Sequence, residues 1–422
     1  MNQDRILSRL AVNSSLLLGV NVVSAGLNFV TSIMIARGLK EIRFGQYTFV
    51  MACVLSLSLF AEFGLNTLIA REVAQSRSEA GRYLMATSFA KLAFSLPLMI
   101  GLWILAPILS SSPEVVVTLR LASPLVLLTS LYGSFPAIFR AYERMEPILL
   151  VSVTGLGIQC IVTAIIIASG RGLVELTLLA IVIQILQLCM GGLIYLRRYH
   201  SPTQIDLSFI KHTVRQTVPF GIAGVIGALE LRLGIFMLAY ISGDEALSQL
   251  AVATRITEVF RLLPNAFVGA LLPALAVLAD RQRGSASSLE KTFLSAYVGM
   301  FLFGALSGAC LIIFAEPMIT LTYGSNFMLA ESSLRWMSLV LPASLLGTLL
   351  EIYLYAQHEE NFVNWVTAGG VGVQVVIGIL LIPLWGAAGA VAAMCIKELV
   401  MIGPLYWKRK QLLIQMSEGE ME

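Results

Sequence analysis

Long apolar runs, separated by short breaks rich in charge, glycine or proline, dominate the chain. Each run is continuous and about 20 residues or longer, which is the length an α-helix needs to cross the hydrocarbon core of a bilayer. A β-barrel would instead show short segments in which apolar and polar residues alternate. We therefore predict membrane-spanning helices, whose backbone amides are paired within each segment. The twelve runs are 11–36, 46–70, 85–109, 118–139, 148–169, 176–196, 217–241, 246–275, 292–316, 331–354, 362–384 and 388–407.

The composition agrees with this pattern and excludes several classes of protein. Apolar residues make up 57% of the chain and charged residues only 13%, against about 25% charged residues in a typical soluble domain. This charge is too little to cover the surface of soluble domains, and the short connectors leave no room for a separate catalytic domain. A net charge of +3 also gives no reason to expect a nucleic-acid partner.

Lysine and arginine are concentrated at both ends and in the connectors after the even-numbered runs. By the positive-inside rule, this bias places both termini in the cytoplasm of a multi-pass protein of the cytoplasmic membrane. The five cysteines lie within apolar runs and the three histidines within polar connectors. The sequence therefore predicts no metal site, no cofactor and no enzymatic activity.

The longest connector lies at the middle of the chain and suggests two halves of six helices each. With an offset of 215 residues, the stretch 140–144 after the fourth run can be laid on 355–359 after the tenth. We predict an all-α integral membrane protein whose two six-helix lobes are related by a pseudo-twofold axis along the membrane normal. The predicted parts are an N-terminal lobe (1–200), a cytoplasmic linker (201–216), a C-terminal lobe (217–410) and an acidic cytoplasmic tail (411–422).

Charged residues inside the predicted spans are costly and are expected to face protein or water. Arg255, Glu258 and Arg261 are spaced by three and fall near one helix face, while Arg232 lies well inside the seventh run. One interpretation is a cationic lining for an anionic substrate, since arginine binds a diphosphate with two parallel hydrogen bonds. The alternative is that Arg255, Glu258 and Arg261 neutralise one another and only hold helices together.

The remaining charges in the spans have the same two interpretations. Lys91 is a candidate substrate-binding cation, although Lys91, Lys397 and Glu398 are close enough to helix ends for their charged groups to reach the membrane surface. Glu62, Glu230 and Glu258 are candidate carboxylates for ion coupling or ion pairing.

Glycines within the spans are expected mainly at close helix contacts, with hinges as the alternative. They include Gly299, Gly304 and Gly308, and also Gly221, Gly224 and Gly227. The second set has the spacing GxxGxxG but follows no strand, so it does not indicate a nucleotide site.

Several stretches carry a resemblance to a known family. The N-terminal half contains FVTSIMIARGL, FGQY, FGL and REVA, and later stretches are FRAYERMEP, YG and WGAAGA. They occupy residues 29–39, 44–47, 63–65, 71–74, 139–147, 323–324 and 385–390. Together they resemble polysaccharide flippases, the O-antigen and capsule repeat-unit translocases of the multidrug/oligosaccharidyl-lipid/polysaccharide exporter superfamily. The stretch 243–250 departs from that family because it has no aromatic residue.

The resemblance implies a twelve-helix, two-lobed flippase that moves polyprenyl-diphosphate-linked oligosaccharide across the membrane by alternating access, for surface polysaccharide biosynthesis. It implies that cavity cations engage the diphosphate or an acidic sugar, which suits Arg232 and Arg255. A proton or sodium ion could drive the cycle, and the polysaccharide polymerase machinery is a candidate partner.

Three alternatives have different sequence requirements. A cation-coupled multidrug exporter of the same superfamily usually has a carboxylate in its first span, and 11–36 has none. A flippase of lipid-linked peptidoglycan precursors typically has fourteen spans. A membrane glycosyl-polymerase or ligase would need a long external loop.

Overall fold

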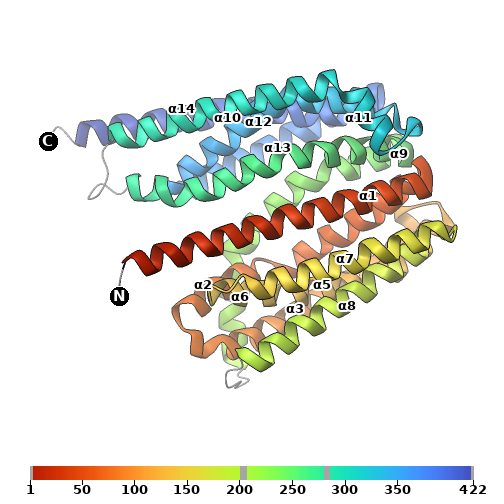
Figure 1. The fold of residues 1–422 in the computed structure, drawn as a ribbon, viewed down its shortest axis with the longest axis horizontal. Coiled ribbons are helices and arrows are strands. Elements are labelled where there is room, and N and C mark those ends of the chain that lie inside the picture. The colour runs from red at the N-terminus through yellow and green to blue at the C-terminus, as the bar shows by residue number, and fades with distance from the viewer. Residues whose placement is uncertain (1–2, 200–206, 280–285, 420–422) are drawn as a thin grey trace. The chain divides into compact units, whose positions relative to one another are not determined.

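The computed structural model describes residues 3–199, 207–279 and 286–419, and all of its regular elements in these ranges are helical (Figure 1). The helices of the first half are α1 (Gln3–Glu62), α2 (Leu65–Gln75), the 3-10 turn η1 (Arg77–Glu79), α3 (Ala80–Leu109), α4 (Pro113–Ala122), α5 (Pro124–Tyr132), α6 (Ser134–Ala141), α7 (Glu146–Ala168) and α8 (Leu173–Arg198). The second half contains α9 (Leu207–Ala279), α10 (Ala286–Ile313), α11 (Ala315–Thr322), the 3-10 turn η2 (Ser325–Phe327), α12 (Ala330–Ala356), α13 (Glu360–Trp385) and α14 (Ala387–Gly419).

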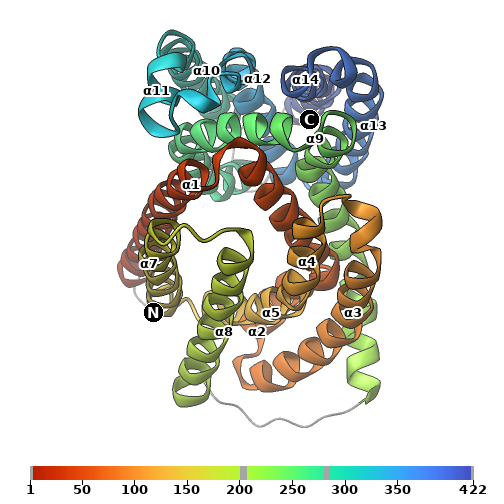
Figure 2. The ribbon, with the colours of Figure 1, turned by 90° about the vertical axis from the view of Figure 1, so that its right-hand side faces the viewer.

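Two of these helices are too long for a single membrane crossing, and each is divided by one residue. Helix α1 is interrupted at Lys40 (φ 63°, ψ −177°) and α9 at Gly243 (φ 80°, ψ −171°). Figure 2 shows the red ribbon of α1 bending back between its two limbs. The same backbone conformation therefore joins the first two crossings of each half.

The described residues contain nine helical stretches that are long and apolar enough to cross a membrane, and a bent pair within α9 makes a tenth. Counting the two limbs of α1 and of α9 separately, the helices make twelve crossings. This confirms the all-α, membrane-spanning fold that the hydrophobic pattern predicts. Two crossings are broken: α1 ends at Glu62 and continues as α2, and α4, α5 and α6 together form the fourth crossing.

The chain divides into two compact units, Met1–Leu229 and Glu230–Glu422, and the boundary falls inside α9. The first part of α9 therefore belongs to the first unit. The predicted linker 201–216 lies partly outside the described residues and from Leu207 onward forms the first turns of α9, whereas the predicted tail from 411 onward continues α14 as far as Gly419.

Local turns repeat between the two halves. Glu143 (φ 58°) follows α6 and His358 (φ 60°) follows α12, and these two non-glycine residues with positive φ are 215 positions apart. In each turn, two backbone amides donate hydrogen bonds to carbonyl groups at the end of the preceding helix, in the same pattern. One of the two is Glu143 N–H to the Arg140 carbonyl in the first turn and His358 N–H to the Tyr355 carbonyl in the second. The backbone thus supports the internal offset that the sequence suggests.

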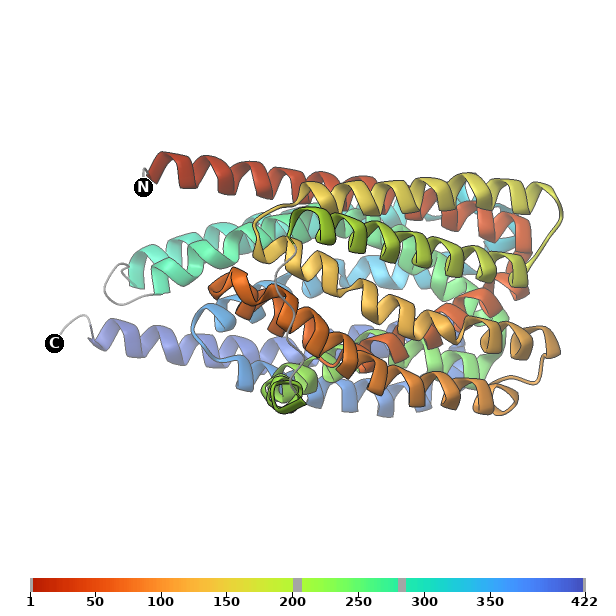
Figure 3. The same cartoon turned by 90° about the horizontal axis from the view of Figure 1, so that it is seen from below.

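In the first unit, α7 and α8 run side by side, and α7 lies against the first limb of α1 (Figure 3). The close approach of α1 and α7 is possible because Gly38 faces the Ile167 side chain without a Cβ.

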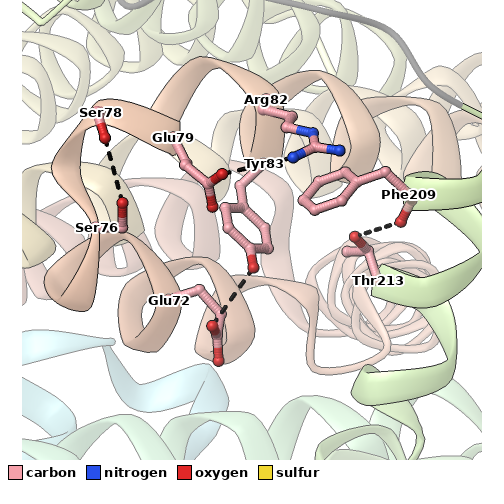
Figure 4. A network of polar contacts seen from close by, with 8 residues as sticks. All are labelled: Glu72, Ser76, Ser78, Glu79, Arg82, Tyr83, Phe209 and Thr213. Atoms are coloured by element: carbon pink, nitrogen blue, oxygen red, sulfur yellow. Dashed lines mark hydrogen bonds and ion pairs between the residues drawn. The ribbon is translucent and has the colours of Figure 1, made fainter.

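The start of α9 is attached to the first unit through an aromatic residue (Figure 4). The ring of Phe209 lies 3.8 Å from the Arg82 guanidinium and 5.0 Å from the ring of Tyr83. Tyr83 in turn donates a hydrogen bond to Glu72 on α2 at 3.4 Å. These contacts combine a cation–π interaction with edge-on aromatic packing.

The second unit is built on α10, α12, α13 and α14, whose buried side chains form one apolar core. Arg409 on α14 lies within this core, although its position near the C-terminus suggests a surface residue. Its guanidinium bonds to Glu290 on α10 and lies 4.0 Å from the ring of Phe293 and 5.4 Å from that of Tyr353.

Glycines on α10 allow close packing, and they give a matched test. A Cβ at Gly304 would lie 2.7 Å from the Pro342 Cα on α12, whereas a Cβ at Gly299 would have no atom within 4 Å. We expect Gly304→Ala to cost about 1–3 kcal/mol through overpacking. Gly299→Ala should be neutral or stabilising by up to about 1 kcal/mol. Thermal unfolding in detergent measures both, and equal melting temperatures would contradict the packing role of Gly304.

Candidate functional site

Two predicted cations of α9, Arg232 and Arg255, lie on opposite sides of the kink at Gly243, both in the second unit. Arg255 and Glu258 form an ion pair of 2.9 Å, and both are about half-exposed, at 47% and 53%. Arg232 is more buried, and the charges of Arg255 and Glu258 both act on it. Its Nε atom is buried and has no hydrogen-bond partner among the described residues. Two guanidiniums and one carboxylate leave this group, which we call the α9 cation group, with a net positive charge.

Arg261 does not extend the pair. It is half-buried, and its charge acts instead on Glu351 of α12. The predicted triplet is therefore split: Arg255 and Glu258 neutralise one another, as one interpretation of the sequence expects, and Arg261 faces another carboxylate.

A second charged group lies deeper in the same unit. The Lys397 ammonium lies 2.6 Å from Glu230 and 3.2 Å from Glu398, and only 5% of its side chain is exposed. Glu351 is electrostatically coupled to all three of these residues. The expectation that Lys397 and Glu398 extend to the membrane surface is wrong, because carboxylates from α9 and α14 hold the ammonium inside the unit.

Lys91 of the first unit also does not reach the surface. Its side chain is 0% exposed and lies on α3. Its ammonium donates hydrogen bonds to Asn66 Oδ1 at 2.5 Å and to Ser134 Oγ at 2.6 Å. The half-buried Glu62 is the carboxylate that acts on it electrostatically. In this conformation Lys91 is a buried internal cation rather than an exposed one.

Sequence reasoning missed the neutral partners Asn66 and Ser134. They are separated from Lys91 by 25 and 43 residues, and hydrophobic periodicity does not show which helices are neighbours. The sequence nevertheless marked Asn66 as a residue that needs a partner. It is a polar amide within an apolar run, just after Phe63 and Gly64, and a buried amide is normally hydrogen-bonded.

A model of the polysaccharide biosynthesis protein family matches residues 10–279, which is more than half of the chain. The chain belongs to this family. The matched region covers the first unit from residue 10 onward and includes the α9 cation group. A search of curated proteins found no significant match to the chain.

Solved structures to which this polysaccharide biosynthesis protein is similar include a lipid II flippase and transporters of the MOP superfamily. The inward closed conformation of the lipid II flippase MurJ superposes with a TM-score of 0.78 at 15% identity, covering 97% of this chain and 91% of that one. An inward-facing multidrug resistance MATE family transporter gives 0.75 at 16% identity, covering 96% and 99%. A MOP superfamily transporter from Pyrococcus furiosus, described as having reverse polarity of its binding pocket, gives 0.68 at 16% identity, covering 95% of each chain. These similarities identify the fold.

Proposed function

We propose that this protein translocates a polyprenyl-diphosphate-linked oligosaccharide across the cytoplasmic membrane by alternating access, for surface polysaccharide biosynthesis. Both termini lie in the cytoplasm in this proposal, and the head group enters from that side while the polyprenyl chain stays in lipid. The protein acts as a transporter and not as an enzyme. The polymerase that consumes the translocated repeat unit is a natural partner.

The observation that carries the proposal is the α9 cation group. A buried guanidinium atom without a hydrogen-bond partner is costly, so Arg232 has unused capacity to bind an anion. The charge of Arg255 acts on Arg232, and Arg255 is half-exposed. Two planar guanidiniums whose charges act on one another suit the two phosphates of a diphosphate, since each phosphate can accept parallel hydrogen bonds.

The predicted roles of Arg261 and Lys91 are changed in this proposal. Arg261 completes the positive end of the binding region, near Glu351, and Lys91 acts within the first unit. Of the candidate coupling carboxylates, Glu258 is released from Arg255 when the diphosphate binds, and Glu230 remains paired with Lys397. Glu62 is available to a proton or a sodium ion in the first unit.

A flippase for lipid-linked peptidoglycan precursors is the second candidate, supported by the fold shared with the lipid II flippase MurJ. Its substrate would also present a diphosphate to Arg232 and Arg255. A cation-coupled multidrug exporter is less well supported, since the net positive charge of the α9 cation group repels a cationic drug.

Mass spectrometry of lipids that co-purify with the protein tests the proposal. We expect polyprenyl-diphosphate sugars to be recovered with the wild-type protein, and less of them with Arg232→Ala. Recovery of a peptide-bearing precursor would favour the second candidate. Binding of amphiphilic cations alone would contradict the proposal.

A further inference from the structure

Lys91 and Lys397, the two buried lysines among the described residues, differ in the charge of their partners. Lys397 bonds to the carboxylates of Glu230 and Glu398. Lys91 is at least as buried, yet its two hydrogen-bond acceptors, Asn66 and Ser134, are both neutral. The ammonium charge of Lys91 is therefore not cancelled by a directly bonded carboxylate.

Lys91 also joins two breaks in neighbouring crossings. Asn66 is the second residue of α2, directly after the break at Phe63 (φ 42°) and Gly64 (φ 73°). Ser134 is the first residue of α6 and follows Gly133 at the break between α5 and α6. One amine thus connects the points at which the second and fourth crossings are interrupted.

The packing around this amine is tight. A Cβ at Gly133 would lie 3.3 Å from the Asn66 Cγ, so the absence of that Cβ leaves space for the asparagine amide. A Cβ at Gly64 would lie 2.6 Å from the Phe220 Cβ, so the first break is itself packed against the part of α9 that belongs to this unit. A change in the hydrogen bonds of Lys91 is therefore transmitted to both breaks.

One carboxylate, that of Glu62, acts electrostatically on Lys91. The helices α1, α2, α4, α5 and α6, the turn η1 and the start of α9 pack against α3. Among their described residues Glu62, the last residue of α1, is the one whose charge acts on Lys91. An isolated charge in an apolar interior is costly, and the cost is relieved by a counter-charge or by transfer of the proton. Glu62 is only half-buried, so part of its side chain lies at the protein surface.

We propose that Lys91 is a proton-binding site of the transport cycle, at which the charged ammonium holds the two helix breaks together and the neutral amine releases them. In the releasing step an N–H bond at Lys91 Nζ breaks and the proton passes to the Glu62 carboxylate, which gives it to solvent. In the reverse step the amine regains the proton. The proposal rests on the proposed transport function, but it concerns the first unit alone and is independent of the substrate.

Distance measurements on the substrate-free protein test this proposal. Spin labels are attached at Gln75→Cys on α2 and Arg140→Cys on α6, both exposed positions, with the native cysteines replaced by alanine. Electron–electron double resonance between about pH 5.5 and about pH 9.5, a range wide enough to titrate a perturbed amine, should show a shift in the distance distribution of the wild type. Lys91→Met should lose this shift, and Lys211→Met, which removes an exposed lysine, should keep it.

A second variant keeps the test decisive if Lys91→Met does not fold. Asn66→Asp places a carboxylate on the ammonium and should keep the low-pH distribution throughout the range. If the spin-label distances of the wild type did not change with pH, Lys91 would be only a structural contact and the proposal would be overturned. A retained shift in either Lys91→Met or Asn66→Asp would overturn it as well. Since no substrate is present, a wrong assignment of the transported lipid cannot produce these outcomes.

Discussion

Replacing Arg232 with alanine is expected to reduce export of the lipid-linked oligosaccharide at least about tenfold without lowering the amount of protein in the membrane. A hydrogen bond to a charged group contributes about 1.5–3 kcal/mol, and 1.4 kcal/mol corresponds to a factor of ten. The loss of Arg232 removes a guanidinium whose Nε has no hydrogen-bond partner in the described part of the chain, so folding loses little. The measurement is export of the repeat unit in cells, normalised to the level of the protein in membranes.

Arg255→Ala should show a similar but smaller loss, because this side chain is already paired with Glu258. Glu258→Gln distinguishes binding from ion pairing: it should keep or improve substrate binding, because it frees Arg255. Arg335→Ala is the matched control, since Arg335 is an exposed arginine of the same unit that pairs with Glu331. Normal export by both Arg232→Ala and Arg255→Ala would remove the α9 cation group from the mechanism.

The second large effect concerns stability and is expected for Lys397→Met. The change removes the ammonium between Glu230 and Glu398 and leaves two carboxylates close together inside the unit. Breaking a buried ion pair in this way costs about 3–5 kcal/mol. Thermal unfolding of the purified protein in detergent should show a clear fall in melting temperature.

A double variant isolates the interaction from the loss of the lysine itself. Lys397→Met combined with Glu230→Gln should recover part of the stability, because fewer charges are then left without partners, and coupling energies for contacting residues are about 0.5–3 kcal/mol. Lys291→Met, which changes an exposed lysine of the same unit, should unfold like the wild type. If the effects of Lys397→Met and Glu230→Gln were simply additive, the ion pair would not stabilise the unit.

The hydrophobic pattern predicted the crossings because each run reports the length and polarity of its own segment. The interruptions were harder to predict. Gly243 could have been recognised as a site for positive φ, but Lys40 adopts the same conformation without being a glycine. A lysine with φ 63° is held there by its surroundings, since the left-handed region is unfavourable for a residue with a Cβ.

For the charged groups too, contacts between residues near one another in the sequence were predictable and contacts between distant helices were not. The pair of Arg255 and Glu258 is three residues apart and was predictable from helix geometry alone. Both hydrogen-bond partners of Lys91, and Glu230 among the partners of Lys397, come from other helices, with Glu230 lying 167 residues from Lys397. Arg409 illustrates the same limit, because the positive-inside rule accounts for its end of the helix but not for its burial against Phe293.

Direct measurement of translocation tests the central claim most closely. The purified protein is reconstituted into vesicles that carry a fluorescent polyprenyl-diphosphate oligosaccharide, and a membrane-impermeant reagent reports how much of the head group has reached the other leaflet. We predict rapid translocation by the wild type, with Arg335→Ala equal to it and Arg232→Ala close to the rate of empty vesicles. Translocation no faster than in empty vesicles for the wild type, or equally fast for Arg232→Ala, would contradict the account.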